Sequence, residues 1–149
     1  MAVDRSHEAA NDAERARLRS LIGRLKDEEL ARPMPGGWTV AAQLAHVGFW
    51  DARAVFALEK WGRGVEPPPG DYEPEDVSWI NDSAKPLALA LPPRMAAQLS
   101  LRLAEEADKG IAALSDELVE KIRVAGPFNI SRAEHRREHL DDIERTLGG

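Results

Sequence analysis

The sequence contains no cysteine among its 149 residues. This absence excludes disulfide bonds and thiolate-ligated zinc, so thiol chemistry would need a thiol supplied by another molecule. The sequence also has no apolar run approaching about 20 residues, and its first residues lack the apolar segment of a signal peptide. We therefore expect a soluble, cytoplasmic protein that does not associate with membranes.

An excess of positive charge is also missing. The 26 acidic residues outnumber the 20 basic ones, which gives a net charge of -6 and a pI of about 5.3. Nucleic-acid binding depends on a basic face, so no nucleic-acid partner is expected. The length fits a single domain spanning residues 1–149, which can bury roughly two-thirds of its unfolded surface without cross-links.

Helical periodicity is the main pattern that is present. Apolar residues spaced three and four apart predict helices over residues 7–31, 39–61, 93–115 and 131–147. The Pro- and Gly-rich connection 32–37 is short, so the first two helices are expected to be antiparallel neighbours. No strand longer than a few residues is predicted. The fold class is therefore all-α, most simply a four-helix bundle.

Two of these helices have recognisable starting residues. Thr39 is expected to cap the second helix, because its hydroxyl can accept a bond from a free backbone N–H. Ser131 is expected to cap the last helix, and Glu134 three residues later completes a capping-box pattern.

The long connections are less regular. Residues 62–76 contain three consecutive prolines and are long enough to cross the end of a bundle or to form the rim of a pocket. A short helix is expected within residues 77–91, interrupted at Pro86. Residues 116–130 are predicted to form a second long connection.

Three of the four histidines suggest a metal site. His135 and His139 are four residues apart, so they share one face of the last helix, and His46 lies on the second helix. Neutral imidazole binds zinc, nickel, copper and iron, and three protein ligands with an open position are typical of a catalytic metal. The alternative is a solvated HxxxH face with charged neighbours, and an ordinary half-buried His46.

The positions of these histidines along their helices impose a condition. His46 and His139 both lie about 10–12 Å from the N-terminal ends of their helices, at a rise of about 1.5 Å per residue. If the two helices run antiparallel, they must be offset along their axes to bring the ligands level.

Further candidates share the stripe of His46. Gln43 precedes it, and Trp50 and Arg53 follow it, at helical spacing. Arg53 could bind a substrate carboxylate through two parallel hydrogen bonds, or could pair with a glutamate of a neighbouring helix. Trp50 is expected to be part of the core or of a pocket wall.

Two aspartates could support the site. Asp142 follows His139 by three residues and could accept its ring N–H, although a surface carboxylate is the simpler interpretation. Asp51 falls on the apolar stripe of the second helix, where an unpaired buried charge would be very costly. We therefore expect Asp51 to have a buried polar partner.

Two segments carry a family resemblance: GGWTVAAQLAHVGFWDA (residues 36–52) and EHRREHLDDI (residues 134–143). They resemble the DinB/YfiT-like family of bacterial metalloproteins, whose members have a Trp-Ser/Thr pair, a histidine about seven residues later and a C-terminal HxxxH. The resemblance places the metal ligands on His46, His135 and His139. It implies an up-down-down-up bundle with a long crossover between the second and third helices, holding a divalent ion, most often zinc or nickel.

The resemblance also implies an activity. Relatives include thiol-dependent S-transferases and the mycothiol-dependent maleylpyruvate isomerase. An enzyme acting on a small molecule is therefore expected, with a low-molecular-weight thiol such as mycothiol or bacillithiol as cosubstrate. One alternative is metal-dependent hydrolysis. Another is a non-catalytic bundle that binds a metal or small ligand and forms a homodimer. A third is a metal-free structural bundle.

Overall fold

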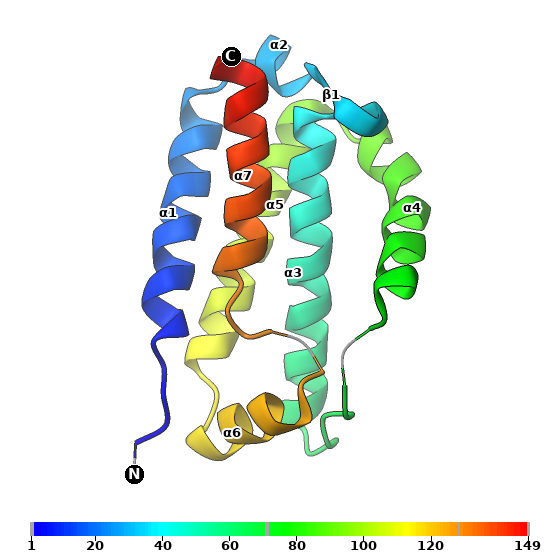
Figure 1. Cartoon of the computed structure of the whole chain (residues 1–149). Coiled ribbons are helices and arrows are strands. Elements are labelled where there is room, and N and C mark those ends of the chain that lie inside the picture. Colours follow the sequence, from blue (N-terminus) through cyan, green and yellow to red (C-terminus); the bar gives the residue numbers. More distant parts are fainter. Residues whose placement is uncertain (1, 71, 128, 149) are drawn as a thin grey trace.

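The computed structural model describes residues 2–70, 72–127 and 129–148, most of which are helical. The bundle consists of the long helices α1 (His7–Arg24), α3 (Val40–Gly62), α5 (Pro93–Ala112) and α7 (Ala133–Gly148). Helices α1 and α7 run in one direction and α3 and α5 in the other (Figure 1). The crossover between α3 and α5 contains α4 (Pro74–Ala90), which packs on the outside of α3. The expected all-α, up-down-down-up bundle is confirmed.

The first two long helices are not neighbours, contrary to the prediction. Helix α1 packs mainly against α5 and α7, and α3 packs against the same two helices, so α1 and α3 lie diagonally across the bundle (Figure 1). They are antiparallel, as expected. The connection between them spans this diagonal because it folds over the end of the bundle.

That connection contains the short helix α2 (Asp27–Leu30) and two paired strands, β1 (Pro33–Met34) and β2 (Trp38–Thr39). The strands are antiparallel, with Met34 opposite Trp38. Between them the 3-10 turn Pro35–Gly37 holds Gly36 and Gly37 at φ +80°, which side chains with a Cβ rarely adopt. Thr39 then accepts the backbone N–H of Ala42 at 3.0 Å, so its predicted capping role is confirmed.

Helix α1 ends at Arg24 and does not continue to residue 31. Leu25 is already extended, with ψ 137°. Arg94 of α5 donates to the carbonyls of Ile22 and Leu25 at 3.1 and 2.6 Å. The carbonyls at the end of the helix are therefore satisfied by a side chain distant in sequence, which helical periodicity does not reveal.

The prediction that Pro86 interrupts the crossover helix is wrong, because α4 runs through this residue. Proline removes one backbone hydrogen bond, leaving the carbonyl of Asp82 without its helical donor. Pro86 and Asp82 are both exposed, so water can satisfy that carbonyl.

The predicted connection 116–130 contains a helix, α6 (Asp116–Ala125). Ser115 caps it by accepting the N–H of Leu118 at 3.2 Å, and Gly126 ends it in the left-handed region at φ +68°. Buried Val119 and Ile122 form its apolar side. This serine cap, the three-residue apolar spacing and the terminal Gly-Pro were a helix signal that the prediction missed.

The predicted Ser131 cap and its capping box are also wrong. Helix α7 begins at Ala133, and the capping group comes from α1. The Asn11 side-chain oxygen accepts the backbone N–H groups of Arg132 and Ala133 at 2.7 and 3.0 Å. Its amide donates to the carbonyl of Ile130 at 3.0 Å. A fully buried Asn11 thus attaches the start of α7 to α1.

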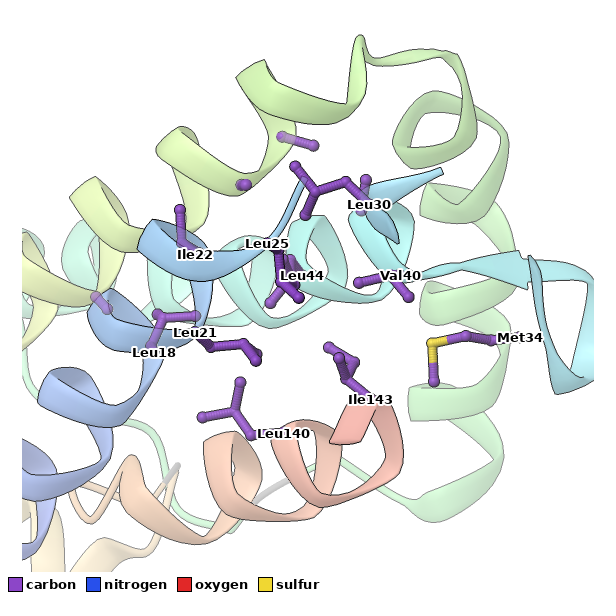
Figure 2. Packing of buried hydrophobic residues seen from close by; sticks show 14 residues of the cluster. Leu18, Leu21, Ile22, Leu25, Leu30, Met34, Val40, Leu44, Leu140 and Ile143 are labelled. Carbon is purple, nitrogen blue, oxygen red and sulfur yellow. The ribbon is translucent and has the colours of Figure 1, made fainter. Parts of the chain in front are cut away.

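The main apolar core fills the half of the bundle nearest the strand pair. Figure 2 shows side chains from α1, α3 and α7 meeting there, including Leu18, Leu21, Leu44, Leu140 and Ile143. Helices α3 and α5 lie close together at Gly48, where an added Cβ would lie 3.2 Å from the Cα of Ser100.

None of the helices in the described part of the chain is both long and apolar enough to cross a membrane.

Candidate metal centre

The three predicted histidines come together between α3 and α7. The Nε2 atom of His135 lies 3.3 Å from Nε2 of His46 and 3.2 Å from Nε2 of His139. The ring centroids are 4.7 to 5.1 Å apart. His46 is buried, and the other two are half-buried. One potential ligand atom from each ring therefore converges on a common point.

The spacing of these nitrogen atoms fits a bound ion. Zinc–nitrogen bonds of about 2.0–2.1 Å in a tetrahedral site separate neighbouring nitrogens by about 3.3–3.4 Å. The two observed separations, 3.3 and 3.2 Å, agree with this value. A neutral imidazole nitrogen has either one N–H or one lone pair, so His135 Nε2 cannot form an ordinary linear hydrogen bond to both neighbours. A cation shared by three lone pairs satisfies all three.

The outward-facing ring atoms differ in their surroundings. The side-chain amide of Gln43 contacts Nδ1 of His139. An imidazole that binds an ion through Nε2 carries its proton on Nδ1, and rotation of the Gln43 amide presents Oε1 as the acceptor. The Nδ1 of His135 is buried without a hydrogen-bond partner among the described residues. Trp38 lies against His46, with ring centroids 5.6 Å apart.

The environment keeps the rings neutral. Burial lowers the pKa of His46 to about 4 and that of His135 to about 2, and neighbouring imidazoles add to both shifts. Burial also lowers the pKa of His139. The three imidazoles are therefore in the unprotonated form that binds metal at neutral pH.

Ion pairs hold the two ligand-bearing helices in the required register. Asp51, near the middle of α3, accepts a bond from Arg132 at 3.0 Å and bonds from Arg136 at 3.2 and 3.3 Å. Figure 1 shows that α7 begins about halfway along α3. This axial offset satisfies the condition inferred from the sequence and brings His46 level with the HxxxH pair. The expected buried partner of Asp51 is thus two arginines.

Arg136 extends this network to α5 and α1. It donates two bonds of 2.8 Å to Asp108, which also accepts a 2.6 Å bond from Arg15. The Arg136 side chain is fully buried, whereas the adjacent Arg137 is about half exposed. The alternative of a solvated HxxxH face with charged neighbours is therefore wrong for Arg136, which joins three helices behind the histidines.

A cavity of about 670 Å³ opens beside the three imidazoles. Its size is in the range of small-molecule sites. Its walls are mostly apolar and aromatic and come from α3, α4, the crossover and the segment before α7. The lining residues include the three histidines, Trp50, Arg53, Trp61, Tyr72, Asn81, Asn129, Arg132 and Glu138.

The remaining predicted residues occupy different places. Trp50 and Arg53 line the cavity, and the Trp50 indole donates to Asn81 at 2.7 Å. Asp51 lies behind the histidines, where it pairs with the buried arginines. Asp142 pairs with Arg145. The group that contacts the His139 ring is the Gln43 amide.

Several residues of the site were not singled out from the sequence. Arg132, Arg136 and Asp108 form the buried network, and Tyr72 and Asn81 complete the cavity wall. Arg132, just before α7, and Arg136 on it have the same i, i+4 spacing as the HxxxH pair and could have indicated a second functional stripe. Tyr72 and Asn81 come from a crossover whose position no local pattern reveals.

Searches of curated proteins and of solved structures find no match to this chain. A family model described as the DinB superfamily matches residues 10–140, a range that contains all three histidines. The match covers most of the chain, and the helical bundle with a three-histidine group agrees with it. The chain therefore belongs to the DinB superfamily.

Proposed function

We propose that the chain is a divalent-metal-dependent enzyme that transfers the sulfur of a low-molecular-weight thiol to a small electrophile. The observation that supports this best is the convergence of three Nε2 atoms at the wall of an open cavity. A structural metal site is usually closed by four protein ligands, whereas a catalytic site keeps a position for water or substrate. Only three candidate ligands group together in the described residues.

His46, His135 and His139 would hold the ion, with zinc or nickel as the metals that suit imidazole. A bound ion would supply Lewis acidity, lowering the pKa of a thiol so that the thiolate forms near neutral pH. The chain has no cysteine, so that thiol would be a cosubstrate such as mycothiol or bacillithiol. The same chemistry would serve hydrolysis if water took the place of the thiol.

The protein's own groups would perform the remaining tasks. The Gln43 amide orients the His139 ring, and the Asp51–Arg136 pair keeps the two ligand helices level. Trp50 and Trp61 contribute apolar walls that exclude water from a bound substrate.

Metal analysis of protein purified without an affinity tag tests the first part of the proposal. After incubation with zinc or nickel, the wild-type chain should retain about one equivalent, and His135→Ala should lose it. His7→Ala is the matched control, because His7 lies outside the cluster. Absence of bound metal in the wild-type protein would refute the proposal.

A thiol screen then tests the chemistry. A thiol that binds the folded, metal-loaded protein should raise its unfolding midpoint. At a thiol concentration of 100 times the dissociation constant, the free energy of unfolding should rise by roughly 2.7 kcal/mol. No such shift should occur with His135→Ala. If the protein hydrolyses esters while no thiol binds, hydrolysis replaces S-transfer as the proposed activity.

A further inference from the structure

The cavity has a second polar feature at Arg53, two helical turns from His46 on the same face of α3. The Arg53 guanidinium carbon lies 5.4 Å from the centroid of the Trp50 ring and 5.0 Å from that of Tyr72. The guanidinium also donates to the Tyr72 hydroxyl. Arg53 is exposed, and its contacts with the two rings restrict the positions that its planar fork can take.

Arg53 has donor capacity to spare. Across residues 2–70, 72–127 and 129–148, no carboxylate lies within ion-pair distance of its guanidinium. By contrast, Arg132, which also lines the cavity, is engaged by Asp51. The prediction that Arg53 pairs with a glutamate of a neighbouring helix is therefore not met within these ranges. An arginine that contacts two rings and has no acid partner within these ranges is suited to receive a carboxylate.

Amide groups add further donors nearby. The Asn81 oxygen accepts the Trp50 indole N–H, so the amide nitrogen of this lining residue remains as a donor. The Asn129 oxygen accepts the backbone N–H of Ser131, so its amide group is likewise a donor. The cavity thus combines apolar walls with hydrogen-bond donors.

The cavity lining also has an acidic side chain near the histidines. Glu138 lines the cavity next to His139, and its negative charge acts on that ring. The distance along α3 from His46 to Arg53 is about 10 Å between Cα atoms.

From these features we propose that the cavity binds an apolar carboxylic acid, with its carboxylate on Arg53 and its other end at the three histidines. This inference rests on the proposed function for the metal end of the ligand and adds the substrate class. The Trp50 ring would contact the ligand body between the two polar ends.

A matched pair of probes tests the proposal by calorimetry with zinc-loaded protein. Mercaptohexanoate and mercaptohexanol share a thiol and a chain length and differ in the charge at the far end. The wild-type protein should bind the acid about tenfold more tightly, the lower end of the range for a hydrogen-bonded charge. Arg53→Gln should abolish this preference while leaving mercaptohexanol binding unchanged, and Arg53→Lys should retain part of it.

Arg63→Gln is the control, because Arg63 is an exposed arginine just beyond the end of α3 and outside the cavity lining. This variant should keep the full preference for the acid over the alcohol. Added salt should weaken that preference in the wild-type protein and in this variant alike. Equal binding of acid and alcohol by the wild-type protein, or a preference that survives Arg53→Gln, would overturn the carboxylate inference alone. Failure to bind zinc, or binding of neither thiol, would instead refute the proposed function and this inference together.

Discussion

Replacing Arg136 by methionine tests the buried ion-pair network most directly. Methionine reproduces the flexible apolar stem of arginine but has no charge, so the change removes the guanidinium while keeping the apolar contacts of the stem. Asp51 would then keep only its 3.0 Å bond from Arg132, and Asp108 only its 2.6 Å bond from Arg15. Removing one partner of a buried ion pair typically costs about 3–5 kcal/mol, because the opposite charge stays buried.

Each aspartate retains one arginine, so we expect the free energy of unfolding to fall by about 3 kcal/mol, the lower end of this range. A domain of this size has a total stability of roughly 5–15 kcal/mol, so the variant should fold but unfold at lower denaturant. With a slope of about 2 kcal/mol per molar urea, the midpoint should fall by about 1.5 M. Urea titration followed by circular dichroism at 222 nm, the helical signal, measures this.

Arg137→Met is the matched control. Arg137 is the next residue on the same helix, about half exposed, and pairs with Glu14 at 3.2 Å. An exposed pair of this kind contributes about 0–1 kcal/mol. If the two methionine variants unfold within about 1 kcal/mol of each other, the argument that Arg136 is energetically distinct fails.

Four further substitutions have defined outcomes. Asn11→Ala removes the cap of α7 and should cost about 1–2 kcal/mol in urea unfolding; a loss below about 0.3 kcal/mol would contradict the capping assignment. Gly48→Ala should destabilise by about 1–3 kcal/mol through the close contact with α5, whereas Gly23→Ala, with open space around it, should stabilise by about 0.5–1 kcal/mol. Gln43→Leu should weaken zinc binding about 10–100-fold in competition with a chelator, and unchanged affinity would show that the amide does not support His139.

Local patterns in the sequence were enough to predict the helical class and the three histidines. His135 and His139 are four residues apart on a helix, so their convergence follows from helical geometry alone. Thr39 was correctly assigned as a cap for the same reason, because its hydrogen bond reaches only three residues along the chain. Features determined within one helical turn can be inferred without knowledge of the rest of the fold.

Features that depend on contacts between distant segments could not be inferred in this way. Ser131 has the local pattern of a cap, yet Asn11, on another helix, performs that role. The crossover brings Tyr72 to Arg53 and Asn81 to Trp50, and so determines the shape of the cavity. Tertiary packing creates these contacts, and sequence spacing carries no direct record of them.

The sequence by itself determined that this chain forms a helical bundle with three histidines suited to a divalent ion. Only the tertiary structure decided that α1 and α3 lie diagonally, and that α7 is offset along α3 so that the histidines meet. Arg136 and Arg137 illustrate the reason. They are adjacent and identical in type, yet one is buried between two aspartates and the other is half exposed, because the neighbouring helices determine which face of α7 is enclosed.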